Sequence, residues 1–579
     1  MKRREFLKVT AAAGLSVGTL SACGGDTNAP QVTPKKALTP LEKAQIKQEV
    51  FEEKAPQMPP YAGPNPFRHG VASGDPLAHQ VIFWTRITAP ELDEIPVILV
   101  VATDPALKNV IYKGVEYARS TSDYTVKFDP LVPYANTTYY YQFETLGYRS
   151  PIGRSKTIPE AGDASAQHAR IAVVACSNYP QGYFNVYRKV AQRADLDIVL
   201  HLGDYIYEYP QGEYSDPALH NERPVDPPHD IVTLEDYRRR YALYRTDADL
   251  QECHRQHPFI CVWDDHEIAD NSWRDGANNH SPDQGDYHAR KRAAIQAYHE
   301  WLPIRRVMPD DYIKIYRSFD YGQLFTLMML DTRLIGRDEQ ATLPHETRNT
   351  DRHLLGQEQE KWLFDELDRS QGRSAKWHIL GQQIMLSPLT LGSLPDMPNL
   401  PLGGGIKINY DQWDGYQASR RKLLSRIEAM ALDNAVILTG DIHSSWAMDV
   451  SLDPGNIAKY TPHNGNGSLA VEFVTPAVSS PAAPTKGLSD IAFALLATLN
   501  PHMKWVDLYH RGYIVLDVTP EHCKADWFHV DTVQKIDDNE RFARSYFTED
   551  GRNRVTRTKT PSAPKAFAPA LAPSSTEAM

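Results

Sequence analysis

The sequence predicts an α/β protein in which a layered core, two sheets flanked by helices, follows a smaller N-terminal β-sandwich. Residues 67–158 form short segments rich in Val, Ile, Thr, Tyr and Phe, with Asp, Pro, Gly and Ser between them. From residue 169 onward, apolar strand-like runs alternate with helical segments. The first pattern is typical of a sandwich of immunoglobulin or fibronectin type, and the second of layered α/β sheets.

The opening segment has the pattern of an export signal. MKRREFLK contains the paired arginines of a twin-arginine signal, and the run Val9–Leu20 is too short and too rich in Ala, Gly and Ser to span a bilayer. The sequence LSAC, ending at Cys23, resembles a lipobox, in which the cysteine becomes the lipid anchor; the alternative is a plain signal with an incidental cysteine. We therefore expect the twin-arginine translocase to export the folded chain, and a periplasmic or cell-envelope lipoprotein to result.

Changes in composition divide the chain into segments. The stretch after Cys23 is a Pro-, Thr- and Lys-rich tether followed by a short amphipathic helix, and the chain from Arg552 onward is expected to be a loose tail. The helix-prone segment 537–547 is a candidate cover for the active site. The expected segments are 1–23 (signal), 24–65 (tether and helix), 66–160 (β-sandwich), 165–535 (catalytic domain) and 536–579 (C-terminal extension).

Each element of the two domains is predicted from its pattern. Alternating or continuous apolar runs indicate strands, and periodic apolar positions over ten or more residues indicate helices. Strands are expected in the sandwich at 81–88, 95–103, 122–129 and 137–145. In the core, strands are expected at 169–176, 197–202, 258–265, 323–331, 375–381, 434–441, 469–476, 512–519 and 523–530, and helices at 184–194, 288–302, 357–370 and 419–431.

Charge and cysteine content exclude some classes of protein. The net charge of −11 argues against a nucleic-acid scaffold, which needs a basic face. Only five cysteines are present, too few for a disulfide framework to organise the fold. Cys253 could pair with Cys261, and Cys176 with Cys523.

Polar residues of metal-ligand type follow one predicted core strand after another. Sites in open α/β sheets lie outside the carboxyl ends of the strands, so we expect these side chains to meet at one edge. An Asp-x-His sequence in extended chain places both side chains on one face, which suits two ligands of one centre. The residues are Cys176, Asp204, Asp264, Asp265, His266, Asp331, Gln382, Gln383, Asp441 and His443.

These motifs together resemble a known family. ACSN, LGDYIYE, WDDHEIADN, LDTR, GQQ and LTGDIHSS occur in the order seen in the PhoD-type alkaline phosphatase/phospholipase D family, a branch of the calcineurin-like metallophosphoesterases. GVASGDPLAHQVIFWTRIT resembles that family's N-terminal β domain, and NYDQWDGY resembles another of its segments. The resemblance extends from about Phe67 to Val530 and implies a metallophosphoesterase core.

The resemblance implies a binuclear centre of Fe³⁺ and Ca²⁺. Asp204 would bridge the two ions, while Tyr207, His443 and Cys176 would bind iron. His266 would lie beside the substrate as general acid or phosphate contact. Asp265 and Asp441 would bind the second ion.

The second ion is expected to be a hard cation. Asp265 and Asp441 stand where the wider superfamily has Asn and His, and Gln382 or Gln383 stands in place of another His. Carboxylate and amide oxygens suit Ca²⁺, Mg²⁺ or Mn²⁺ better than imidazole does, and calcium needs six to eight oxygens. Further candidates, as ligands or as their supports, are Asn178, Asp264, Asn271 and Asp331.

The expected reaction is hydrolysis of phosphate mono- or diesters, in which metal ions neutralise charge and lower the pKa of bound water. Arg333 in LDTR would donate hydrogen bonds to two phosphate oxygens at once or, alternatively, pair with Asp331. A phospholipase D-like diesterase is the alternative enzyme, because pocket width depends on the long loops 210–232 and 388–414. A phosphate-ester-binding lipoprotein without turnover and a zinc or manganese nuclease are further alternatives.

Overall fold

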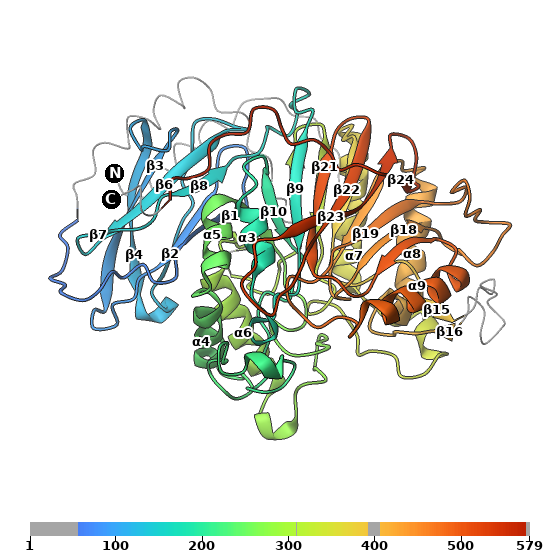
Figure 1. Ribbon diagram of the computed structural model, residues 1–579, viewed down its shortest axis with the longest axis horizontal. Helices are drawn as coiled ribbons and strands as arrows, with labels where there is room; N and C mark the ends of the chain where they lie inside the picture. The colour runs from blue at the N-terminus through green and yellow to red at the C-terminus, as the bar shows by residue number, and fades with distance from the viewer. Residues whose placement is uncertain (1–55, 309, 392–405, 575–579) are drawn as a thin grey trace, which may run out of the picture. The chain divides into compact units, whose positions relative to one another are not determined.

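The structure is a computed structural model that describes residues 56–308, 310–391 and 406–574 (Figure 1). The predicted signal, the lipobox cysteine and the helix of the tether lie outside these residues. Within the described part of the chain, no helix has the length and apolarity needed to cross a bilayer.

A ten-stranded sheet forms the centre of the described chain. Strands β9, β10 and β11 are mutually parallel, β1 continues the parallel order beside β11, and β21 joins antiparallel on the other side. The strands in spatial order are β24 (Thr556–Thr558), β23 (Glu540–Glu549), β22 (His522–Val530), β21 (Gly512–Val518), β9 (Ala169–Val174), β10 (Ile198–His201), β11 (Pro258–Cys261), β1 (Val71–Gly74), β2 (Ile82–Arg86) and β5 (Thr125–Phe128).

A seven-stranded sheet packs against the first. On β17, Val436 and Leu438 join the core shared with β9 and β10, whereas Ile437 joins a second core with the helices α7 and α8; this is the two-residue alternation of a strand buried on both faces. The strands in order are β12 (Arg317–Tyr321), β13 (Phe325–Met329), β14 (Trp377–Gly381), β17 (Ala435–Thr439), β19 (Ala470–Val474), β18 (Ser445–Val450) and β20 (Met503–Asp507).

Helices cover the outer faces of both sheets, which confirms the predicted fold class. The described helices are α3 (Asn185–Ala191), α4 (Leu234–Tyr244), α5 (Ala248–Gln256), α6 (Tyr287–Trp301), α7 (Gly356–Gly372), α8 (Gln417–Ala429) and α9 (Lys486–Leu499). A two-stranded ribbon of β15 (Thr390–Leu391) and β16 (Ile406–Lys407) lies beside α9 (Figure 1). Helix α9 was not among the predicted helices, because residues 491–499 form an apolar run without charged side chains, and such a run does not by itself distinguish a helix from a buried strand.

The N-terminal domain is β-rich as predicted, but its two layers are not separate from the core. One layer is a sheet of its own, and the other consists of β1, β2 and β5, the end of the ten-stranded sheet. Phe83 on β2 packs with Leu99 and Phe143 of the opposite layer. The separate layer contains β4 (Val110–Arg119), β3 (Glu94–Ala102), β6 (Thr138–Thr145) and β7 (Tyr148–Arg149), with β8 (Gly153–Lys156) paired to β6.

Two expectations about the C-terminal region are wrong. Most of the segment 537–547, predicted to be helix-prone, belongs to β23, because pairing with the edge of β22 overrides its local propensity. The described chain after Arg552 is no loose tail: it adds β24, and the carbonyl oxygens of Ala563 and Pro573 accept hydrogen bonds from Arg170 (2.7 Å) and Arg255 (2.8 Å). The four described cysteines are free and buried, so neither possible disulfide is present.

Asp197 fastens this C-terminal segment to the core. Its buried carboxylate accepts the backbone N–H of Arg170 (2.8 Å) and pairs with the ammonium groups of Lys156 and Lys565. Burial alone would raise the pKa of Asp197, but the two ammonium groups hold this pKa below its usual value.

Replacing Asp197 by asparagine is expected to lower the free energy of unfolding at neutral pH by about 3 kcal/mol, because two ammonium groups lose their carboxylate. Since the folded-state pKa is lowered, the stabilisation is complete above the unfolded-state pKa of about 3.9 and is lost as the pH falls through the folded-state pKa. Urea unfolding at several pH values measures this difference. Asp490→Asn, which removes an exposed pair with Lys486, should cost at most about 1 kcal/mol. A loss from Asp197→Asn that is equal at pH 7 and below the folded-state pKa contradicts the argument.

Candidate metal centre

The predicted ligands come together where the parallel strands of the two sheets end. Cys176 follows β9, Asp204 follows β10 and Asp264 follows β11, while Asp441 follows β17 in the facing sheet. Because adjacent parallel strands end at the same edge and the two sheets pack face to face, the four loops converge.

The loops that carry the ligands have unusual backbone conformations. Cys176, Asp204, Asp441 and His443 all have positive φ, between 52° and 62°, which costs about 1–3 kcal/mol per residue and is concentrated at functional sites. Gly203 has φ 108°, and a Cβ there would lie 2.4 Å from the Cβ of Asp264. Glycine is thus required for the loops after β10 and β11 to touch.

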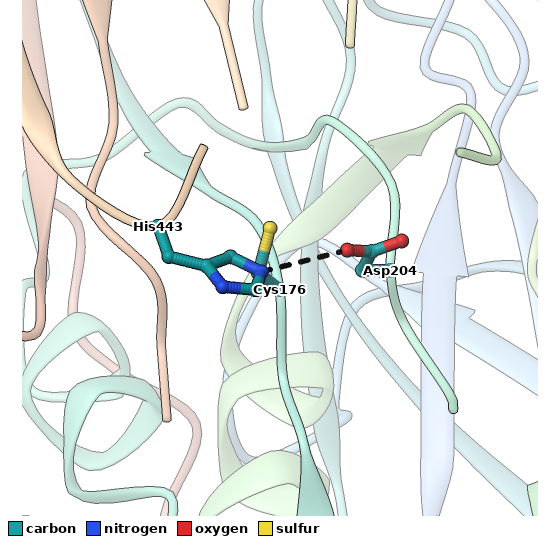
Figure 2. A group of neighbouring side chains, drawn as sticks. All are labelled: Cys176, Asp204 and His443. Atoms are coloured by element: carbon teal, nitrogen blue, oxygen red, sulfur yellow. Dashed lines mark ion pairs between the residues drawn. The ribbon is translucent and has the colours of Figure 1, made fainter. Parts of the chain in front are cut away.

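One cluster offers sulfur, nitrogen and oxygen ligands. Ligand atoms of Cys176, Asp204 and His443 lie within 4.8 Å of one another (Figure 2). The Tyr207 hydroxyl donates to Asp204 Oδ2 (2.9 Å), lies 3.2 Å from His443 Nε2 and accepts from Ser480 (2.6 Å). The four residues predicted to bind iron are therefore neighbours.

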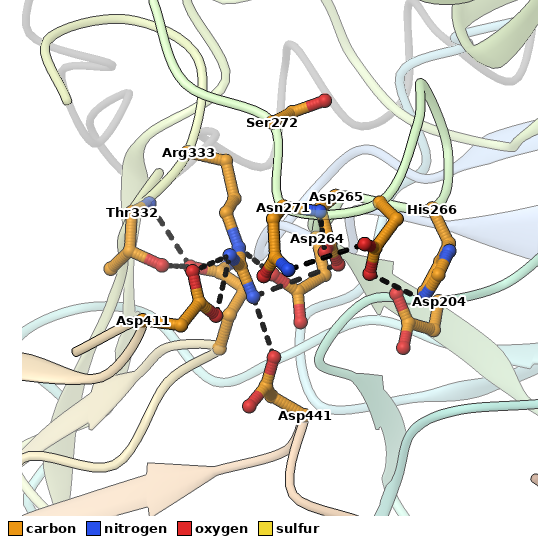
Figure 3. Close-up of polar contacts among 12 residues, drawn as sticks. Asp204, Asp264, Asp265, His266, Asn271, Ser272, Thr332, Arg333, Asp411 and Asp441 are labelled. Carbon is orange, nitrogen blue, oxygen red and sulfur yellow. Dashed lines mark hydrogen bonds and ion pairs between the residues drawn. The ribbon is translucent and has the colours of Figure 1, made fainter. Parts of the chain in front are cut away.

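A second cluster offers only carboxylates. Oxygens of Asp264, Asp265 and Asp441 lie within 4.8 Å of one another (Figure 3). Asp204 connects the two clusters, because one of its oxygens lies within the same distance of ligand atoms of Asp265 and His266. This shared position is what a bridging carboxylate needs.

The chemistry of both clusters fits cations. Asp204 Oδ1, Asp264 Oδ2 and Asn178 Oδ1 are buried and have no hydrogen-bond partner, a costly arrangement unless an ion is bound. Burial and the charge of Asp204 raise the pKa of the Cys176 thiol and of the Tyr207 phenol well above their usual values. A metal ion reverses this effect and holds such groups ionised.

Arg333 is the main positive charge that the described chain places among these carboxylates (Figure 3). Its guanidinium pairs with Asp264, with Asp411 (2.9 Å) and with Asp441 (2.5 Å). Burial raises the pKa of Asp441 to about 6, although Arg333 acts in the opposite direction. For Asp265, burial also acts to raise the pKa, but the charge of Arg333 helps to lower it to about 2.

The alternative partner predicted for Arg333, Asp331, has another role. Its carboxylate accepts the backbone N–H groups of Arg333 and Leu334 (2.8 Å each) and so shapes the turn that carries Arg333. The guanidinium itself lies against the other carboxylates. Contact of Arg333 with a phosphate group remains a prediction.

The remaining predicted residues lie around the clusters. The amide oxygens of Gln382 and Gln383 accept hydrogen bonds from Trp413 (2.8 Å) and Thr332 (2.6 Å), which ties both glutamines to neighbouring loops. The backbone N–H of Asn271 donates to Asp265 (2.6 Å), and the amide nitrogen of Asn178 donates to Tyr214. That any of these glutamines and asparagines binds calcium remains a prediction.

Sequence reasoning missed Glu208, which orients His266. The carboxylate of Glu208 is completely buried and accepts from His266 Nδ1 (2.7 Å), from the N–H of Asp270 (2.7 Å) and from Asn279 (2.9 Å). This contact places a proton on Nδ1 and leaves Nε2 for the site. Burial alone would lower the pKa of His266, but the charges of Glu208, Asp265 and Asp204 raise this pKa well above its usual value.

Replacing Glu208 by glutamine is expected to lower kcat about 10²-fold for an alkyl phosphate, whose poor leaving group needs a proton. Loss of the Glu208 charge lowers the pKa of His266, so the basic limb of the pH–rate profile moves to lower pH. A nitrophenyl phosphate, which needs no proton, serves as the control substrate and should lose much less. Equal losses for the two esters and an unmoved profile would assign Glu208 a purely structural role.

Other contacts of the site come from distant loops. The carboxylate of Asp411 accepts hydrogen bonds from Arg333 and Gln340 (2.9 Å each). The carbonyl oxygen of Pro481 lies 3.1 Å from His443 Nδ1. Asp411 belongs to the NYDQWDGY segment, so the family pattern offered a signal for it. Glu208 likewise ends the LGDYIYE motif, although its role was not predicted, whereas no motif marked Pro481.

Comparisons with known proteins identify related phosphatases. The sequence matches the profile described as PhoD-like phosphatase over residues 171–527, and that of the PhoD-like phosphatase N-terminal domain over residues 53–159. It is 36% identical to alkaline phosphatase D of Bacillus subtilis (strain 168) over 497 residues, 80% of this chain and 78% of that protein. The solved structure of PhoD matches with a TM-score of 0.78 at 32% identity, over 87% of this chain and 94% of that one.

The fold and the comparisons together define a hydrolase of phosphate esters. The chain belongs to the PhoD-like phosphatase family.

Proposed function

We propose that this phosphatase works with a binuclear centre of Fe³⁺ and Ca²⁺. The observation that carries the proposal is the pair of clusters joined at Asp204, one with a thiol, an imidazole and a phenol, the other with carboxylates alone. Cys176, Tyr207 and His443 suit ferric iron, and Asp265 and Asp441 suit a hard dication. Mg²⁺ or Mn²⁺ is the alternative for the second position.

When bound, such a centre supplies positive charge for the phosphoryl group and acidifies water. The protein's own residues hold the proton for the leaving group and balance the charge of the carboxylates. His266, held by Glu208, keeps a proton at the site that the leaving oxygen of the ester can take. Arg333 offsets part of the negative charge of Asp264, Asp411 and Asp441.

We further propose that the substrates are phosphate mono- or diesters outside the cytoplasm. The twin-arginine pattern and Cys23 support export by the twin-arginine translocase and a lipid anchor in the periplasm or envelope. A phospholipase D-like action on lipid headgroups is the second candidate. Rates with a soluble monoester, a soluble diester and a phospholipid separate the two.

Replacing Cys176 by serine tests the iron assignment. Serine is close in size but binds ferric iron less well, so we expect iron content per chain to fall while circular dichroism stays unchanged. A phenolate-to-iron absorption band in the visible spectrum should weaken in parallel. Cys261→Ser and Cys523→Ser are matched controls, because both cysteines are buried and free. Full iron content in the Cys176 variant would mean that the thiol only packs.

A further inference from the structure

Helix α9 exposes an apolar face that nothing in the described chain covers. Leu488, Ile491 and Leu495 are 54%, 69% and 56% exposed, and their spacing of three and four residues places them on one face of the helix. The residues 491–499 contain no charged side chain. Contiguous exposed apolar side chains of this kind usually mark a surface that contacts another protein or a membrane.

The opposite face of α9 is firmly packed. Phe493 and Leu496 pack against the core beneath β18 and β20. Asn500, at the end of the helix, exchanges hydrogen bonds with the backbone of Thr390 (3.0 Å each way), and Ser489 accepts the N–H of Leu508 (2.9 Å). The exposed side chains are therefore presented by a fixed element.

The neighbouring ribbon extends this face. Leu391 on β15 pairs directly with Ile406 on β16, so these two side chains share one side of the ribbon, and Ile408 directly follows β16. Each is about half exposed. We call these residues and those of α9 the apolar rim: Leu391, Ile406, Ile408, Leu488, Ile491 and Leu495.

Both parts of the apolar rim lie close in sequence to residues of the metal centre. Ser480, which donates to Tyr207, lies six residues before the start of α9. Asp411, which pairs with Arg333, lies three residues after Ile408.

We propose that the apolar rim docks onto a lipid bilayer, with α9 lying in the interface. All six side chains are aliphatic, whereas protein–protein contacts usually depend on Trp, Tyr and Arg. The charges at the start of α9, Lys486 and Asp490, pair with each other (2.7 Å). The chain outside the structure supports the same occupant: residues 24–55 could span about 100 Å when extended, enough for a domain anchored through Cys23 to lie on the membrane.

Vesicle flotation tests the proposal independently of the lipid anchor and of turnover. The protein is the metal-loaded full chain carrying Cys23→Ser, with phosphatidylcholine vesicles as probe. The triple variant Leu488→Ser/Ile491→Ser/Leu495→Ser should bind about tenfold more weakly or worse. A control variant, Ile457→Ser/Ile536→Ser/Phe567→Ser, removes three other exposed apolar side chains and should bind like the parent. Because the rim carries no net charge, binding should persist in 0.5 M salt, about the condition that screens surface charges.

Three results would overturn the proposal: no binding by the parent, equal binding by parent and triple variant, or loss of binding in salt. A parent dimer that the triple variant converts to a monomer would identify a second copy as the occupant and would equally overturn it. The single variant Ile491→Ser repeats the test with minimal change to the helix. Activity on a soluble phosphate ester should be equal in all variants, so a failure of docking is distinguishable from a failure of the proposed metal centre.

Discussion

Replacing Asp204 by asparagine is expected to lower kcat for phosphate esters about 10³-fold or more and to reduce the content of both metals. Asp204 is the residue that the two clusters share, so the change weakens both positions at once. Loss of several kcal/mol of charge stabilisation in the transition state corresponds to a factor of this size. Elemental analysis of the purified variant and a phosphatase assay measure the two effects.

Asp331→Asn is the matched control. Asp331 is also buried and also follows a core strand, but its carboxylate accepts backbone N–H groups, which an asparagine oxygen accepts as well. This variant should retain most of the metal and the activity. Full metal content and full activity in the Asp204 variant would refute the shared-ligand scheme.

Replacing Arg333 by methionine is expected to lower the free energy of unfolding of the metal-free protein by about 3–5 kcal/mol, because buried carboxylates lose their counter-charge. Calcium should restore part of this loss, since a cation that binds the folded state stabilises it. Urea unfolding with chelator and with calcium measures both quantities.

The control for this experiment is Arg119→Met, which breaks a half-exposed pair with Glu94 and should cost at most about 1 kcal/mol. Equal stability of the Arg333 variant and the parent in chelator would mean that the clustered carboxylates are neutral. Burial already raises the pKa of Asp264 well above its usual value, so the size of the loss reports how many of these groups are ionised.

The sequence was most informative where local pattern and position coincide. Runs of apolar residues predicted the strands, and the polar residues that follow the strands were expected to meet at one edge; Cys176, Asp204 and Asp441 lie in such clusters. It was least informative where a contact joins distant loops. Glu208 and His266 each lie in a family motif, but their contact spans 58 positions of sequence, and no hydrophobic period indicates that the two side chains meet.

Two fold elements illustrate the same limit. Residues 540–549 have a helix-prone composition, but the free edge of β22 makes them a strand. Most of helix α9 is an apolar run without charged side chains, which by itself does not distinguish a helix from a buried strand. In both cases the deciding partner is brought in by tertiary packing.

The sharing of one sheet by both domains has a consequence for how the protein can be divided. A chain cut before Ala169 would leave β11 with the unpaired N–H and C=O groups that β1 now satisfies, and such a bare edge recruits other chains into aggregates. The N-terminal region is therefore no detachable module for fusion or domain exchange. Limited proteolysis should leave the two halves associated, and melting should occur in one transition.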